Sequence, residues 1–225
     1  MTTCKSSKTT SLFTTATLND SPVFELVSAY YKESRLFRSD FYFEEAFYDF
    51  LTTASEATST LSERQFPIIH LFFEAEYLFT QQIVYIIGTY SDRPLTTHDF
   101  LQLLEIIIYS NWQFPYVNRF VDALDYLAKI IGQQLKTSPA SLKKTQPSFF
   151  RHIQFLAFRL VQNENTSSGN NELYDFVQKK YPLAFEHADK LRTIIKRAFD
   201  IQLSESEVVF LTLHIKRALA NQVDK

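Results

Sequence analysis

Glycine, cysteine and long apolar runs are all scarce in this chain of 225 residues, which has only three glycines and one cysteine. Nucleotide-binding α/β folds place glycine-rich turns against phosphate groups, and no such turn occurs here, so we exclude that class. Few glycines, together with long stretches free of proline, favour an all-α protein.

The single cysteine, Cys4, excludes a disulfide framework and a cysteine-based metal site. No apolar run reaches the roughly 18 residues of a membrane span. The N-terminus, rich in threonine and serine, lacks the apolar core of a signal peptide. We therefore expect a cytoplasmic protein without membrane contact, in which residues 1–20 form a disordered leader.

Positive charge is also limited, because the formal net charge is -2 and the pI is about 6.2. Basic residues are scattered and adjoin only in pairs, such as Lys143–Lys144 and Lys179–Lys180. A nucleic-acid-binding domain usually carries a basic face, which this composition does not favour.

The sequence contains no motif of an enzyme active site. We find no nucleophile elbow, paired-carboxylate motif or phosphate loop. No His-x-x-x-His pair occurs either, so a zinc site built from histidines has no support. We expect a protein that is not an enzyme and binds neither a cofactor nor a metal.

Apolar residues recur with the period of an α-helix along most of the chain. This pattern predicts helices over 21–34, 39–54, 94–111, 117–135, 148–162, 172–181, 182–199 and from Ser204 onward, and one long or two short helices over 66–90. The segment 136–147, which contains two prolines, is predicted as a loop. Thr96 with Asp99, and Ser204 with Glu207, have the spacing of helix-capping boxes.

Three predicted helices carry apolar stripes that should face a core. The stripes consist of Val23, Leu26, Val27 and Tyr30; of Phe43, Phe47 and Phe50; and of Phe120, Leu124, Leu127 and Ile131.

The two halves of the chain resemble each other when they are shifted by 108 positions. Aromatic and aliphatic core positions and one helix cap keep this register without a gap. We therefore predict a tandem of two similar helical-bundle domains, 21–115 and 116–225. His152 aligns with Glu44 and His214 with Ile106, so the first half does not repeat the histidines of the second.

Two histidines stand on mostly apolar helices, His152 in "SFFRHIQFLAFRLVQ" and His214 in "FLTLHIKRAL". A single histidine in such a place is most often a hydrogen-bonded core residue. Three motifs around them carry a family pattern: His152, Phe155 and Arg159; Tyr181 and Pro182; and Leu203, Ser204, Glu207, Leu211, Leu213, His214 and Ile215. In this order and spacing, roughly residues 117–225 resemble the regulation domain controlled by the bacterial sugar phosphotransferase system (PRD).

The resemblance implies an all-α domain in which His152 and His214 accept phosphoryl groups. The implied donors are the histidine phosphocarrier protein and sugar-permease enzyme II subunits. Arg159 and Arg217, which follow the histidines on the same helices, could pair with the added charge. The members of this family are homodimeric transcription antiterminators or activators. Because the two halves of the chain resemble each other, residues 21–115 would be a degenerate copy of the same domain.

The sequence departs from the family in two respects. Arg151 precedes His152 where the family often has an aspartate, which could change how readily His152 is phosphorylated. Nucleic acid would be bound only through a missing or unrecognised domain, because the 20-residue leader is too short to be one. The chain is thus expected to be a fragment or a stand-alone regulator.

Two alternatives stay open at this point. Residues 93–124 loosely resemble a helix-turn-helix, which would make the first half a DNA-binding domain, although the segment is not basic. The chain could also be a dimerisation scaffold whose histidines are not phosphorylated.

Overall fold

The computed structural model describes residues 22–34, 40–52, 59–90, 94–163 and 172–223. Every regular element in these ranges is a helix, as the composition predicts. The chain divides into two compact units, residues 1–118 and 119–225. The proposed leader, Cys4 and most of the loop after Gln162 lie outside the described residues.

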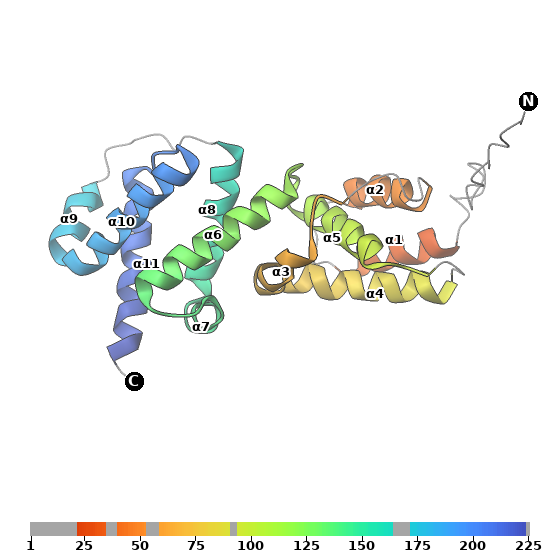
Figure 1. Ribbon diagram of the computed structural model, residues 1–225, viewed down its shortest axis with the longest axis horizontal. Coiled ribbons are helices and arrows are strands. Elements are labelled where there is room, and N and C mark those ends of the chain that lie inside the picture. Colours follow the sequence, from red (N-terminus) through yellow and green to blue (C-terminus); the bar gives the residue numbers. More distant parts are fainter. Residues whose placement is uncertain (1–21, 35–39, 53–58, 91–93, 164–171, 224–225) are drawn as a thin grey trace, which may run out of the picture. The chain divides into compact units, whose positions relative to one another are not determined.

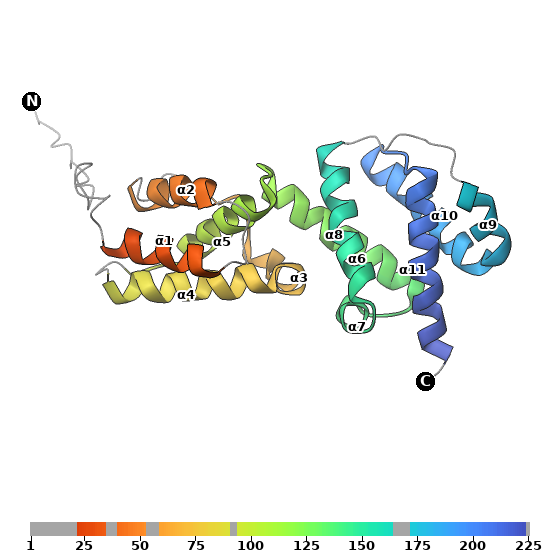
Figure 2. The same ribbon diagram turned by 180° about the vertical axis from the view of Figure 1, so that it is seen from behind.

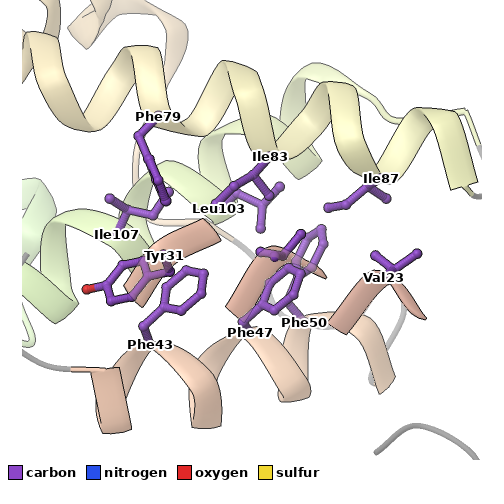
Figure 3. Packing of buried hydrophobic residues seen from close by; sticks show 11 residues of the cluster. Val23, Tyr31, Phe43, Phe47, Phe50, Phe79, Ile83, Ile87, Leu103 and Ile107 are labelled. Carbon is purple, nitrogen blue, oxygen red and sulfur yellow. The ribbon is translucent and has the colours of Figure 1, made fainter. Parts of the chain in front are cut away.

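The first unit contains α1 (Pro22–Ser34), α2 (Asp40–Thr52), α3 (Phe66–Phe72), α4 (Glu74–Tyr90) and α5 (Thr97–Trp112), and a short 3-10 helix, Glu63–Gln65, precedes α3. Helix α1 packs against α2 and α4, and α5 packs against the same two helices. These four helices enclose a common core, which Figure 3 shows from close by.

Aromatic side chains fill much of that core. Tyr31 of α1 and Phe43 of α2 stack with ring centroids 3.8 Å apart. Phe43, Phe47 and Phe50 are buried, so the stripe predicted on α2 is confirmed. On α1 the predicted stripe is confirmed at Val23 and Val27 but wrong at Leu26 and Tyr30, which are exposed, and Tyr31 is buried instead. The packing of α2 and α4 selects which side of α1 faces inward.

The apolar segment 66–90 forms two helices. Helix α3 ends at Phe72, and the backbone of the next residue, Phe73, leaves the helical region with φ -124° and ψ 41°. The side chain of Phe73 is completely buried. Burial of this side chain accompanies the break between α3 and α4, which helical periodicity did not locate.

Helix α5 begins with the capping box predicted from the sequence. The side-chain oxygen of Thr96 accepts a hydrogen bond from the amide of Asp99 at 3.2 Å, and an Asp99 carboxylate oxygen accepts from the amide of Thr96 at 2.8 Å. The backbone amides of Thr96 and Asp99, which have no partner within the helix, are thereby paired.

The second unit contains nearly all of α6 (Val117–Leu135) and the whole of α7 (Pro139–Thr145), α8 (Pro147–Gln162), α9 (Glu172–Lys180), α10 (Pro182–Phe199) and α11 (Glu205–Val223), as Figures 1 and 2 show. The stripe predicted on α6 is buried throughout, at Phe120, Leu124, Leu127 and Ile131.

The prediction of a loop over 136–147 is wrong, because helix α7 occupies much of it. The Ser138 hydroxyl accepts a hydrogen bond from the amide of Ser141 at 3.1 Å, and Pro139 stands in the first turn. Proline there costs no hydrogen bond, since the first amides of a helix have no partner within it. Both prolines of this segment begin helices rather than interrupt a loop.

Helix starts recur at a fixed spacing in the two units. Helices α4 and α10 begin at Glu74 and Pro182, and helices α5 and α11 begin at Thr97 and Glu205. Both pairs are separated by the 108 positions of the sequence repeat.

Candidate functional site around His152 and His214

Helices α8 and α11 bring the two predicted histidines together in the second unit. The rings of His152 and His214 lie 5.4 Å apart between centroids, with 29° between their planes. Phe149 contacts His214, and Arg159 contacts Glu207. Residue numbers thus rise along α8 as they fall along α11, so the two helices run in opposite directions.

Phenylalanine rings surround the histidine pair. Phe149 stacks on His214 with centroids 5.0 Å apart and planes 4° apart. Phe210 lies 5.9 Å from the ring of His152 and is 52% exposed. The imidazoles therefore sit in an apolar setting that has one open side.

Glu207 is the only carboxylate that the described contacts place on this pair. Its side chain is 5% exposed. One oxygen, Oε2, lies 3.3 Å from Nε2 of His152, within ion-pair distance but without the geometry of a full hydrogen bond. The other oxygen, Oε1, forms an ion pair with the guanidinium of Arg159. Glu207 thus bridges a histidine and an arginine of α8 from the first turn of α11.

The local environment shifts two pKa values. Burial and the nearby charges of His152 and Arg217 lower the pKa of His214 from 6.5 to about 4. Burial raises the pKa of Glu207, but the proximity of His152 and Arg159 outweighs burial, and the net effect is a lowered pKa. At neutral pH the site therefore holds a neutral His214 and an ionised Glu207.

A surface pocket of about 280 Å³ opens beside His152. Its lining consists of His152, Phe155, Phe158, Arg159, Glu207 and Phe210. The pocket brings an imidazole, a guanidinium and a carboxylate together between apolar walls. Two of the four predicted site residues, His152 and Arg159, line it.

The other two predicted residues lie apart from the pocket lining. His214 is partly buried behind His152, and Arg217 is exposed one turn further along α11. Arg217 is close enough to His214 to lower its pKa, but no described residue forms an ion pair with it.

Sequence reasoning assigned Glu207 only to the helix cap. Part of that role is present, because the amide of Glu207 donates to the Ser204 hydroxyl at 3.2 Å. A second signal was available: Glu207 precedes His214 by seven residues, and Arg159 follows His152 by seven. Residues seven apart share a helix face, so antiparallel helices can bring the two pairs into register.

The three remaining histidines take no part in this site. His70 contacts the ring of Tyr77 at 3.7 Å, and His98 is exposed, both in the first unit. His187 lies with Nδ1 3.1 Å from the side-chain oxygen of Gln134. Among the described residues, no three His, Cys, Asp or Glu side chains converge on a position that could hold a metal ion.

Glu44, which occupies the repeat position of His152, lies on α2 in the first unit. It forms an ion pair of 2.7 Å with Lys32 of α1, and both side chains are partly exposed. This is the ordinary environment of a surface glutamate.

Residues 125–218 match the family model described as "PRD domain". Curated relatives with a similar segment include Protein GlcT of Staphylococcus aureus strains JH9, Newman and USA300. Each is 35% identical over 86 residues, which covers 38% of this chain. The resemblance seen in the sequence is thereby confirmed for the second unit.

The match spans only 30% of the length of these relatives. The family-model match, residues 125–218, includes all four predicted site residues. Within the part of the chain that the structure describes, no helix is long and apolar enough to cross a membrane.

Proposed function

We propose that the second unit is a regulatory module whose His152 and His214 accept phosphoryl groups from the sugar phosphotransferase system. The donor is the histidine phosphocarrier protein or a sugar-permease enzyme II subunit. One observation carries the proposal: within a segment that matches the PRD family, the two histidines lie 5.4 Å apart beside Arg159 and an open pocket.

The chemistry of the site supports phosphoryl acceptance. A neutral imidazole has a free lone pair, and the lowered pKa keeps His214 neutral at cellular pH. The donor supplies an already activated phosphoryl group, so the acceptor site needs correct positioning rather than a full set of catalytic groups. Arg159, which lines the pocket, can pair with the incoming phosphoryl oxygens.

Phosphorylation would rearrange charges within a packed region. The added group carries between one and two negative charges at neutral pH, and it would arise beside the ionised Glu207. The phosphoryl group would compete with Glu207 for the guanidinium of Arg159, and so weaken the bridge between these two residues. Such a local change can shift an interface between two packings, and we propose a homodimer interface as its target.

The wider role follows from the same family. The chain acts as the regulatory part of a bacterial transcription antiterminator or activator in the cytoplasm, and it is not an enzyme. Nucleic acid is bound by another domain, which the described residues do not contain.

We also propose that the first unit is a degenerate copy of the same domain. The 108-position spacing of the helix starts supports this, as do the matching caps at Thr96 and Ser204. Glu44 and Ile106 stand at the histidine positions, so this copy would accept no phosphoryl group on histidine there.

No observation favours the helix-turn-helix alternative. Its second helix would be the start of α6, whose residues Phe120, Val121 and Leu124 are buried in the second unit. The exposed positions of α6 include Arg119, Asp122, Tyr126 and Lys129, a mixture that does not form a basic surface for phosphate contacts.

The test is a phosphotransfer assay. The chain is incubated with phosphoenolpyruvate, enzyme I and the phosphocarrier protein, with and without candidate enzyme II subunits, and acid-labile phosphate is measured by intact mass. We expect incorporation that falls in His152→Ala and in His214→Ala and disappears in the double variant.

His98→Ala is the matched control, because it removes an exposed histidine of the first unit. It should leave incorporation unchanged. Absence of phosphate with every cognate donor would refute the proposal and leave the scaffold interpretation.

A further inference from the structure

We propose that His152 is phosphorylated at Nδ1, because Glu207 holds its ring in the tautomer that carries hydrogen on Nε2. His214 presents the opposite nitrogen, Nε2. This inference rests on the proposed function and specifies the atom at which each transfer takes place.

The Nε2 side of His152 is closed. Nε2 is buried, and its one charged neighbour is Oε2 of Glu207 at 3.3 Å, which is itself buried. A carboxylate beside a ring nitrogen stabilises a hydrogen on that nitrogen. Nε2 therefore has neither a lone pair to offer nor an open path for an incoming group.

The Nδ1 side of His152 is open. The side chain of His152 is 15% exposed, and none of this exposure comes from Nε2. No described residue forms a hydrogen bond with Nδ1, and this atom is not buried, so it is accessible from the solvent. In the tautomer with hydrogen on Nε2, Nδ1 carries the lone pair and can reach the donor.

His214 has the reverse arrangement. Its Nδ1 is buried and has no hydrogen-bond partner among the described residues. Its Nε2, by contrast, is accessible from the solvent. No carboxylate is recorded beside its ring. Two neighbouring imidazoles with opposite open nitrogens would yield two different phosphohistidine isomers in one site.

The Nδ1 lone pair of His152 attacks the phosphorus of a donor phosphohistidine, forming the new N–P bond. The donor's N–P bond breaks, and its electron pair returns to the donor imidazole. His152 keeps its Nε2 hydrogen, so its ring becomes positively charged, and the anionic Glu207 stabilises that charge.

Arg159 completes the arrangement as a positioning residue. Its ion pair with Oε1 fixes the carboxylate, so that Oε2 remains directed at His152. Glu207 is likewise a positioning residue, since it contacts the acceptor ring and not the phosphoryl group.

The first experiment needs no donor. Histidine side chains of the full chain are labelled with ¹⁵N, and long-range proton–nitrogen NMR spectra give the tautomer of each ring, assigned with His152→Gln and His214→Gln. We expect hydrogen on Nε2 of His152. Hydrogen on Nδ1 of a neutral His152 would overturn the inference, whatever the outcome of phosphotransfer.

The second experiment identifies the isomers directly. The labelled chain is phosphorylated by the phosphocarrier protein and, separately, by potassium phosphoramidate, and the phosphorus–nitrogen coupling is recorded. We expect phosphorus on Nδ1 of His152 and on Nε2 of His214. Phosphorus on Nε2 of His152 would refute the inference and leave the proposed function intact, whereas no phosphate on His152 from either donor would refute both.

Variants separate positioning from folding. Glu207→Gln keeps the size of the side chain but removes its charge, and we expect about tenfold slower transfer to His152 with a mixture of isomers. Glu207→Asp retains a carboxylate and should restore Nδ1 as the main site. Glu186→Gln, which removes an exposed carboxylate of α10, is the matched control and should change neither rate nor isomer.

Circular dichroism spectra establish that each variant is folded. If Glu207→Gln is folded and still gives only the Nδ1 isomer at the original rate, Glu207 does not select the nitrogen and the inference fails.

Discussion

At the scale of single residues, the carboxylate of Glu207 connects most features of the site. It contacts His152, pairs with Arg159 and stands in the first turn of α11, where a negative charge is favoured by the helix dipole. Removing it would leave the partly buried guanidinium of Arg159 without its counter-charge, and the partly buried imidazole of His152 without its neighbouring carboxylate.

We therefore expect Glu207→Ala to destabilise the second unit by about 3 kcal/mol, the lower end of the cost of breaking a buried charge pair on one side, because Arg159 is partly exposed. Urea denaturation followed by circular dichroism measures the change. Glu186→Ala, at an exposed ion pair with Lys190, should leave the transition in place. Equal effects of the two variants would show that the Glu207 bridge contributes little.

His214 gives the second unit a specific dependence on pH. Its pKa in the folded protein is about 4, compared with an ordinary value of 6.5, so the unfolded chain binds its proton first as pH falls. The free energy of unfolding therefore has its full value with respect to His214 above pH 6.5, and it decreases progressively as the pH falls from 6.5 toward 4. Glu207, with a lowered pKa, adds a further loss only below about 4.5.

The expected result is a lower denaturation midpoint at pH 5 than at pH 7, with a smaller difference in His214→Gln. Urea titrations of both proteins at the two pH values measure it. An identical pH response in the variant would contradict the assignment to His214.

At the scale of elements, the turn between α6 and α7 needs a close backbone approach. A Cβ atom on Gly132 would lie 2.9 Å from the carbonyl oxygen of Thr137, whose amide donates to the carbonyl of Gly132 at 3.0 Å. Lys136 within this turn has φ 47°, in the left-handed region. Gly132 thus allows the end of α6 to fold back toward α7.

Gly132→Ala should lower the stability of the second unit by about 1 kcal/mol or more, because steric overlap outweighs the better helix propensity of alanine. Gly88→Ala is the matched comparison, since no atom lies within 4 Å of a Cβ placed there in α4. It should raise the stability of the first unit by up to about 1 kcal/mol. Thermal denaturation of the two variants measures both effects, and a stabilising Gly132→Ala would refute the steric argument.

At the scale of the whole molecule, each of the two units has its own buried core. The first is built from aromatic and aliphatic residues of α1, α2, α4 and α5, whereas the second is built around α6, α8, α10 and α11. The chain's single tryptophan, Trp112, belongs to the first unit and provides a fluorescence signal for it alone.

Phe47→Ala should therefore destabilise the first unit by about 3–5 kcal/mol, because it removes a fully buried ring. We expect the tryptophan fluorescence transition to move to lower urea concentration, while the second unit's part of the circular dichroism transition stays in place. A shift of the whole circular dichroism transition by the same amount would mean that the units unfold together.

The sequence by itself determined the helical class, the positions of most helices and the pairing of His152 with His214 in one domain. It could do so because these features depend on local properties of the chain. Such properties are the periodicity of apolar residues, capping pairs such as Thr96 and Asp99, and the order of the family motifs. The apolar stripes of α2 and α6 were predicted correctly for the same reason.

Only the tertiary structure decided the remaining features, because they depend on residues far apart in the chain. Packing against α2 and α4 selected the buried face of α1, and burial of Phe73 accompanied the break in the segment 66–90. The approach of α11 to α8 placed Glu207 against His152 and Arg159, which changes a helix-cap residue into part of the site. The local sequence pattern cannot specify which carboxylate meets a partly buried imidazole, since that contact forms only when the two helices pack together.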